Sequence, residues 1–327
     1  MQVSASLVTI AVVSASRAIA TSMNSLSNFH PFRSLQARDA YLAHYDRRAG
    51  DWPVPSECRL IATADGQTFV RISGPASAPP LVLLPGVNST SLMWQPNIAE
   101  LAHSFRVYAV DNIYDFGRSI WRRPMRTEAD LVRWLDDLFA ALGLHTLNLC
   151  GISYGGWIAS RYALRRQERL QKLVLLAPVF TVLPLRLEFI ARALLCLIPL
   201  RTFTKRFVYW LSDDSVSRGG DQRQLVDLMV DDAFIGLTHF KRHQPVRPDI
   251  LSDAELASIA IPTLYLVGEN EKLNSATDAV ARLNRVAPQI ETVVIGGAGH
   301  DLTIAQADTV NRLILAFLAQ TTQHLHH

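Results

Sequence analysis

The stretch CGISYGGW places one serine among three glycines, between an apolar run and a helical pattern. Its core, GISYG, is a G-x-S-x-G sequence, which between a strand and a helix is typical of a nucleophilic serine on a sharp turn. Such a turn is strained and brings backbones close together. We therefore expect Gly151 and Gly155 to avoid collisions and Gly156 to let the helix lie close to the strand. The pattern predicts Ser153 as a nucleophile; the alternative is a plain glycine-rich loop.

A serine hydroxyl is a weak nucleophile, so it needs a general base and a carboxylate that orients this base. After a G-x-S-x-G turn the expected chain order is serine, acid, histidine. His300 lies in GGAGHDL, after the last apolar run and before a final helical pattern, which predicts the same sheet edge as Ser153. A solvent-exposed loop histidine is the alternative. The histidines excluded because they precede the serine or lie in the tail are His30, His44, His103, His145, His324, His326 and His327.

The acid is expected in the loop after TLYLVG, where GENEKL supplies two glutamates. We choose Glu271, because three residues past Gly268 the chain should have cleared the strand end and turned toward the histidine loop. Glu269 and Asp278 stay open as alternatives. For each of these carboxylates, the other interpretation is a surface side chain without a catalytic role.

The chemistry also needs N–H donors for the oxyanion of a tetrahedral intermediate. The N–H of Tyr154, at the positive end of the helix that follows the serine, is one predicted donor. The second is the N–H of Val87, after LVLLPG, where Gly86 permits close approach.

Composition excludes several other classes of function. With 327 residues, 49% of them hydrophobic, and a net charge of +3 without a basic block, the chain predicts a globular protein that does not bind nucleic acid. Three scattered cysteines match neither a disulfide framework nor a zinc site. His239 and His243 are spaced as metal ligands would be on a helix, but no third ligand accompanies them, so no metal is predicted. The acidic SDD and VDD pieces are interpreted as ordinary solvated surface.

Short apolar runs alternate with amphipathic stretches from about residue 56, which predicts an α/β protein with a mostly parallel central sheet and helices on both faces. The expected strands include an antiparallel pair joined by an Asp65-Gly66 turn. A helix is expected to open at Thr127, with Glu128 and Asp130 in its first turn. About 80 residues separate two of the later strands, too many for an ordinary connection, and predict an inserted helical cap. The predicted parts are an N-terminal extension in which a helix is allowed, two core parts, the cap and a tail: 1–55, 56–180, 181–260, 261–320 and 321–327.

The N-terminus imitates a signal peptide, but its first positive charge, Arg17, follows the apolar part instead of preceding it. We expect a cytoplasmic protein, with export as the alternative, and whether residues 1–22 belong to the mature protein stays open. The apolar segment at 186–200 carries two arginines and a glutamate. It predicts a cap or interface helix, and membrane contact is not expected. The sequence allows a homo-oligomer.

Five segments together resemble the α/β-hydrolase superfamily, in particular its esterase-like and C–C-hydrolase-like members with an inserted helical cap: LVLLPGVNSTSLMW, RVYAVDNIYDFGRS, LCGISYGGWIASRYALRR, IPTLYLVGENE and VIGGAGH. The chain departs from the family pattern at Pro85, where a histidine is usual, and at Glu271, where aspartate is most frequent. The resemblance implies no metal and no organic cofactor.

Serine at the nucleophile position disfavours the branches that use aspartate or cysteine. The resemblance then implies a serine hydrolase that cleaves carboxylic esters of apolar small molecules through a Ser153–His300–Glu271 triad. Two alternatives are a C–C bond hydrolase or lactonase with the same triad, and a non-catalytic ligand-binding receptor on the same fold.

Overall fold

The computed structural model describes residues 28, 30–196 and 198–320. The predictions for residues 1–22 and for the tail at 321–327 lie outside these residues. Within the predicted N-terminal extension, α2 (Leu35–Ala49) is a helix whose N-cap, Ser34, accepts the N–H of Ala37.

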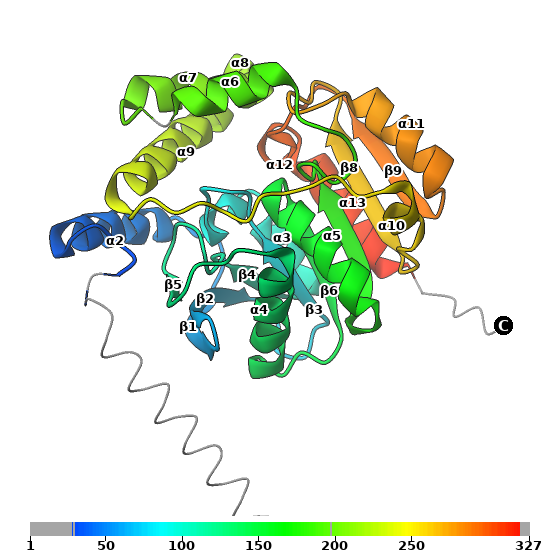
Figure 1. The fold of residues 1–327 in the computed structure, drawn as a ribbon, viewed down its shortest axis with the longest axis horizontal. Helices are drawn as coiled ribbons and strands as arrows, with labels where there is room; N and C mark the ends of the chain where they lie inside the picture. Colours follow the sequence, from blue (N-terminus) through cyan, green and yellow to red (C-terminus); the bar gives the residue numbers. More distant parts are fainter. Residues whose placement is uncertain (1–27, 29, 197, 321–327) are drawn as a thin grey trace, which may run out of the picture.

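One sheet runs through the molecule in the order β1-β2-β4-β3-β6-β7-β8-β9, and β5 pairs with β2 (Figure 1). Neighbours are antiparallel from β1 to β4 and parallel from β4 through β3 to β9. The predicted mostly parallel sheet is therefore confirmed. The strands are β1 (Ser56–Thr63), β2 (Gly66–Ser73), β3 (Pro80–Leu84), β4 (Arg106–Val110), β5 (Ile120–Trp121), β6 (Leu147–Ile152), β7 (Leu170–Leu176), β8 (Thr263–Gly268) and β9 (Ile290–Ile295).

The hairpin of β1 and β2 forms as predicted, but its turn was placed one residue too late. Thr63 pairs with Gly66, so the two turn residues are Ala64 and Asp65. Gly66 already belongs to β2, with φ of 150°. The buried carboxylate of Asp65 accepts a hydrogen bond from Arg123 at 2.6 Å, so a tertiary contact fixes the turn.

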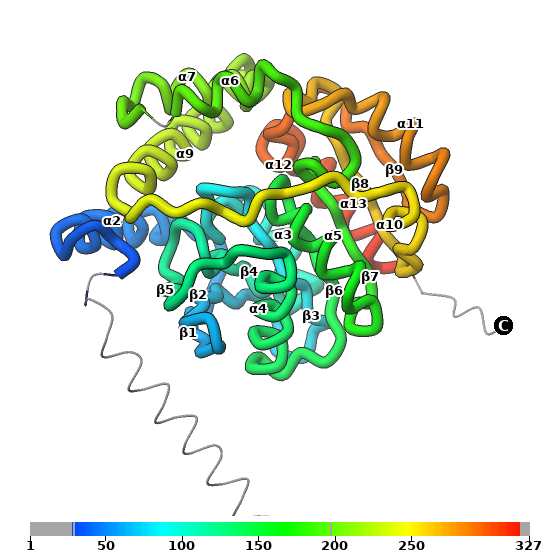
Figure 2. The backbone as a smooth tube through the Cα atoms, viewed as in Figure 1, coloured from blue at the N-terminus to red at the C-terminus, as the bar shows by residue number. Residues whose placement is uncertain are grey.

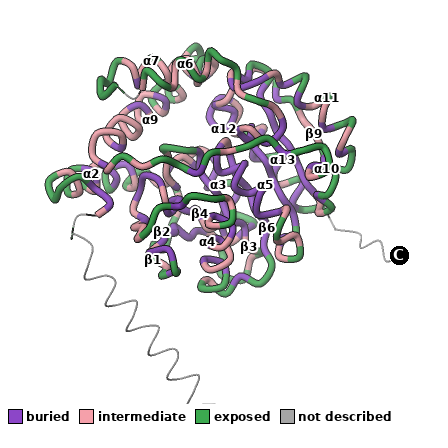
Figure 3. The backbone as a smooth tube through the Cα atoms, in the orientation of Figure 1, coloured by how far each residue is buried: buried purple, intermediate pink, exposed green. Residues whose placement is uncertain are grey.

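Helices cover both faces of the sheet, which explains why its central strands β3, β6 and β8 are almost completely buried. The core is divided into two buried clusters, one on each face of the sheet. In β3, Val82 and Leu84 belong to one cluster, whereas Leu81 and Leu83 belong to the other. Figure 3 shows burial concentrated in the sheet and the helices beside it. The first cluster contains side chains of α4 (Glu128–Ala141), α5 (Tyr154–Arg166), α10 (Asp253–Ala257) and α11 (Ala276–Val286); the second contains those of α3 (Ile98–Ser104), α12 (Leu302–Ala305) and α13 (Ala307–Ala319).

The start of α4 follows directly from its sequence. Thr127 accepts the N–H of Asp130, and the Asp130 carboxylate accepts the N–H of Thr127 in return. This capping box satisfies two N–H groups that a helix start otherwise leaves unpaired. The helix predicted to open at Thr127 is confirmed.

Between β7 and β8, four of the helices in the described chain arch over one edge of the sheet (Figure 1). They are α6 (Leu187–Leu195), α7 (Arg201–Leu211), α8 (Asp213–Arg218) and α9 (Gly220–His239). After α9 an extended stretch runs back across the molecule to α10 (Figure 2). Tyr154 and Trp157 of α5 donate to the carbonyls of Val246 and Asp249, at 2.9 and 3.2 Å, and so attach this stretch to the core.

Helix α6 leaves much of its apolar surface uncovered in the chain described. Leu187 is 83% exposed and Leu194 58%. Among the described residues, no helix is long and apolar enough to cross a membrane.

The N-terminal helix α2 lies against α9. His44 and Arg48 both contact the Asp232 carboxylate, at 2.6 and 3.2 Å. Beside them, Phe32 and Phe240 pack with ring centroids 4.4 Å apart. Through these contacts, the N-terminal extension holds α9 in place.

We expect Gly236→Ala to destabilise the protein although alanine favours a helix. A Cβ on Gly236 would lie 2.3 Å from Cδ2 of Phe116, a buried ring. Overpacking of this kind costs about 1–3 kcal/mol, whereas the gain in helix propensity is about 1 kcal/mol. Urea unfolding should show a lower free energy of unfolding. The double variant Gly236→Ala/Phe116→Leu should lose less than the sum of the two single variants, and strict additivity would contradict the contact.

Candidate functional site

Ser153 occupies a sharp turn between β6 and α5. Its backbone is in the left-handed region, with φ of 53° and ψ of −117°, which costs a non-glycine residue about 1–3 kcal/mol. Hydrogen bonds hold it there, because its N–H donates to Leu176 at 2.9 Å and its carbonyl accepts from Val179 at 3.1 Å. The end of β7 thus fixes the turn that projects the serine.

Three glycines make room for this turn. A Cβ on Gly151 would lie 2.3 Å from the carbonyl oxygen of Gly155, and one on Gly155 would lie 2.4 Å from that of Leu84. A Cβ on Gly156 would lie 2.8 Å from Cβ of Pro178. Each distance is far below a van der Waals contact, so a larger residue at any of these positions would displace backbone or the rigid ring of Pro178.

His300 and Glu271 meet at the carboxyl ends of β8 and β9. His300 Nδ1 lies 3.0 Å from Oε2 and 3.2 Å from Oε1 of Glu271. A carboxylate only accepts hydrogen bonds, so Nδ1 carries the hydrogen and Nε2 is left able to accept one. The Leu273 N–H donates to Glu271 Oε1 at 2.9 Å and fixes the carboxylate from its other side.

The other two carboxylates considered for this role lie elsewhere. Glu269 accepts the N–H of Gly297 at 3.2 Å. Asp278 lies in the first turn of α11, whose N-cap is Ser275. Of the three carboxylates, Glu271 is the one hydrogen-bonded to His300.

The environment of His300 raises the pKa of its imidazole. Burial lowers the pKa of this imidazole, but the charge of Glu271, the hydrogen bond that His300 donates to Glu271 and the charge of Asp301 raise it, and the net result lies above 6.5. A histidine whose folded-state pKa is raised stabilises the fold below its unfolded pKa. This contribution is lost as the pH rises through the folded-state pKa.

Ser153 Oγ makes no hydrogen bond to another residue that the structure describes, His300 included. Gly86 lies close to it, since a Cβ there would be 3.5 Å from Ser153 Cβ and 3.9 Å from Oγ. In the described part of the chain, the backbone N–H groups of Val87 and Tyr154 have no protein acceptor. These are the two N–H groups that the sequence predicts as oxyanion donors.

Helix α8 connects the two loops that carry Glu271 and His300. Asn270 donates to Asp214 at 2.9 Å, and the N–H of Ser215 donates to the buried Asp301 carboxylate at 3.0 Å. Lys272 lies 3.5 Å from Asp213. The acidic SDD piece, interpreted from sequence as ordinary surface, thus supports the loops of the acid and the histidine.

The described residues contain no group of three or more His, Cys, Asp or Glu side chains that could hold a metal ion. His239 Nδ1 contacts the Ile235 carbonyl at 2.9 Å, and His243 packs against the rings of Tyr114 and Phe116. Cys58, Cys150 and Cys196 are free thiols, and Cys58 is exposed whereas Cys150 is buried.

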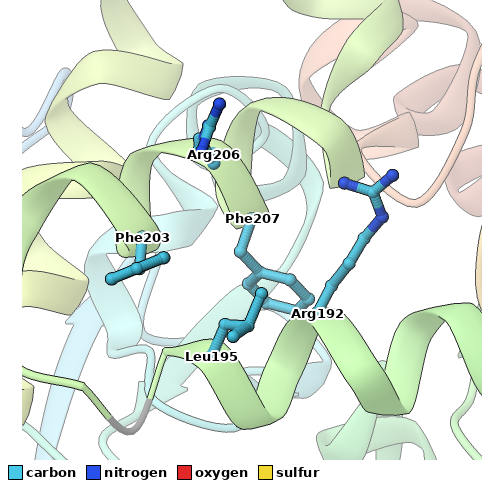
Figure 4. A pocket seen from close by; sticks show the side chains of 5 residues that line it. All are labelled: Arg192, Leu195, Phe203, Arg206 and Phe207. Atoms are coloured by element: carbon cyan, nitrogen blue, oxygen red, sulfur yellow. The ribbon is translucent and has the colours of Figure 1, made fainter.

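A cleft of about 290 Å³ lies between α6 and α7 (Figure 4). Neither Ser153, Glu271 nor His300 lines it. Its wall combines apolar and cationic side chains: Arg192, Leu195, Phe203, Arg206 and Phe207.

Comparisons with known proteins agree on one family. Residues 81–313 match the family described as "Alpha/beta hydrolase family". Carboxylesterase YbfK of Bacillus subtilis (strain 168) is 31% identical over 88% of this chain and 96% of its own length. The "uncharacterized carboxylesterase nap" of the same organism is 33% identical over 86% and 93%. The crystal structure of naproxen esterase (carboxylesterase NP) from Bacillus subtilis superposes with a TM-score of 0.80 at 32% identity, covering 90% of this chain and 99% of that one.

Replacing Glu271 should change the titration of His300. In Glu271→Gln the carboxylate charge is gone while burial remains, so we expect the pKa of His300 to fall below its value in the parent protein. An NMR titration of the imidazole signals measures it. Glu269→Gln is the control, since Glu269 bonds to Gly297 instead. Equal His300 pKa values in all three proteins would contradict the pairing.

Proposed function

The chain belongs to the alpha/beta hydrolase family, and we propose that it hydrolyses carboxylic esters through an acyl-enzyme formed on Ser153. The observation that carries the proposal is the pair of His300 and Glu271, hydrogen-bonded at 3.0 Å at the sheet edge where Ser153 stands on its strained turn. Two relatives of at least 31% identity that bear the name carboxylesterase support the same chemistry.

In the proposed mechanism Ser153 Oγ attacks the ester carbonyl while His300 Nε2 takes its proton. The same imidazole then protonates the leaving alcohol, and a water molecule activated by it releases the acid. Glu271 keeps the imidazole in the tautomer with hydrogen on Nδ1 and stabilises the imidazolium that forms. The raised pKa of His300 is consistent with that second role.

The oxyanion is proposed to bind the N–H groups of Val87 and Tyr154. Both are without a protein acceptor in the described chain, and Gly86, which precedes Val87, lies beside Ser153. Each such donor contributes about 3–4 kcal/mol of transition-state stabilisation.

The substrate is proposed to be an ester of a small apolar molecule. Leu183, Leu185 and Phe189 from the chain after β7 pack against the first buried cluster, so apolar side chains lie between the inserted helices and the core. A pocket with apolar walls favours an uncharged ester over a charged one. Cytoplasmic location, with export as the alternative, and a homo-oligomer stay predictions.

The C–C hydrolase, lactonase and receptor alternatives differ from the ester hydrolase in what the protein turns over. Parallel assays with p-nitrophenyl butyrate, a ring-fission diketone and a lactone distinguish the ester hydrolase, the C–C hydrolase and the lactonase. A receptor would turn over none of them, and its Ser153 would not be labelled by a fluorophosphonate.

Ser153→Ala should lower kcat for p-nitrophenyl butyrate by about 10⁴-fold or more, because the nucleophile is removed while binding is kept. It should also abolish fluorophosphonate labelling. Ser258→Ala is the control, since this serine is exposed and bonds to Glu255 of α10. A Ser153→Ala protein as active as the parent would disprove the acyl-enzyme.

A further inference from the structure

Two buried aspartates lie on the loop between β4 and β5, directly behind the segment that follows Gly86. Asp111 is 0% exposed and Asp115 2%. The sequence argument assigned neither of them a role, although both follow the carboxyl end of the buried strand β4. Buried carboxylates are rare unless paired or functional, so each requires an explanation.

Asp111 is accounted for by structure. It accepts the N–H of Ser91 at 2.7 Å and that of Arg118 at 2.8 Å, and the hydroxyl of Tyr45 donates to it at 3.1 Å. These bonds join three parts of the chain. Of these partners, Ser91 lies nearest to Val87 along the chain, four residues away.

Asp115 is bound next to the proposed oxyanion donor. Its two oxygens accept the N–H of Asn88 at 3.1 and 3.0 Å, and Oδ1 also accepts the N–H of Phe116 at 2.8 Å. Asn88 immediately follows Val87 and is held in the left-handed region at φ of 57°. With Asn88 anchored on one side and Gly86 against Ser153 on the other, little freedom is left to the Val87 N–H.

Every hydrogen-bonding neighbour of Asp115 donates. An ionised carboxylate, which only accepts, satisfies all of them, whereas a protonated one would carry an O–H without a described acceptor. The ionised form is also costly here, because no cation in the described part of the chain forms an ion pair with Asp115. Burial and the like charge of Asp111 raise the pKa of Asp115 to about 7.

We propose that Asp115 is a positioning residue, whose carboxylate fixes the Val87–Asn88 segment so that the Val87 N–H meets the oxyanion. The inference rests on the proposed function. If Asp115 acts in this way, a charged group outside the triad contributes to turnover. The dependence of kcat on pH then reflects the protonation of Asp115 in addition to that of His300.

The other titratable groups around Asp115 are distinguishable from it in the pH dependence of kcat. Tyr41 of α2 and Tyr154 of α5 are buried, which raises the pKa of each far above neutrality. His243 packs on the ring of Phe116, and burial lowers its pKa below 6.5. Burial raises the pKa of Asp111 as well, so the two carboxylates are separated by Asp115→Asn, which leaves Asp111 and its three donors in place.

The test compares Asp115→Asn with the parent protein across pH 5–9, with p-nitrophenyl butyrate as substrate and the active fraction counted by fluorophosphonate labelling. Asparagine has nearly the same volume as aspartate. Its amide NH2 group replaces one carboxylate oxygen, however, and this donor would face N–H groups that also donate. We expect kcat to fall about 10- to 100-fold, which is less than the loss of about 100- to 1000-fold for removal of one oxyanion donor, because the Val87 N–H is displaced and not removed. KM should change less than threefold. Asp115→Glu should recover part of kcat.

The fall of kcat at acid pH, the acid limb of the pH profile, is a readout that a purely structural residue would not change. In the parent protein, kcat should fall below pH 7 more steeply than the tenfold per pH unit that one proton on His300 produces. In Asp115→Asn the fall should not exceed tenfold. The melting temperature at pH 8 should be unchanged or higher, because the variant no longer buries an unpaired charge. Asp46→Asn, which removes an exposed carboxylate that pairs with Arg118 of the same loop, should leave kcat and the acid limb unchanged.

An acid limb of one proton in the parent protein would overturn the proposal, and this measurement needs no variant to fold. Unchanged or increased kcat in Asp115→Asn would overturn it too, an increase meaning that the negative charge opposes the oxyanion. These outcomes are distinct from failure of the proposed function, in which Ser153→Ala itself would stay active and Ser153 would not be labelled.

Discussion

The site depends on one constraint, the left-handed backbone of Ser153 at the junction of β6 and α5. That conformation is unfavourable for a serine and persists because the end of β7 and the start of α5 hydrogen-bond to it from both sides. Gly151 and Gly155 allow the backbones to approach closely enough for these bonds to form. Since β3 and β7 are the direct neighbours of β6, the sheet itself holds the serine.

The remaining parts of the site are brought to this turn by loops at the same edge, and the segment inserted after β7 keeps two of them in place. Helix α8 binds Asn270 beside the acid and Asp301 beside the histidine. At the other end, α9 lies on Phe116, next to Asp115 and the proposed oxyanion donor. The insert therefore contacts both sides of the site.

Much of this arrangement follows from local sequence. The G-x-S-x-G turn lies between β6 and α5 as predicted, and the fold class and the start of α4 at Thr127 are confirmed, because glycines, caps and apolar runs act over a few residues. The hairpin turn was misplaced by one residue, since the long-range contact of Asp65 with Arg123 outweighs the preference of Asp-Gly for the turn. Spacing alone left Glu269, Glu271 and Asp278 open, and only the backbone path after β8 brings Glu271 to His300. The roles of Asp115, Asp214 and Asp301 depend on partners 27, 56 and 86 residues away, which no local pattern encodes.

The most direct test of the central claim is a crystal structure of the protein after reaction with a fluorophosphonate. The account predicts phosphorus bonded to Ser153 Oγ, the phosphoryl oxygen within hydrogen-bonding distance of the Val87 and Tyr154 N–H groups, and His300 still paired with Glu271 while Nε2 faces the adduct. An adduct on another residue, or a phosphoryl oxygen directed away from both N–H groups, would contradict it.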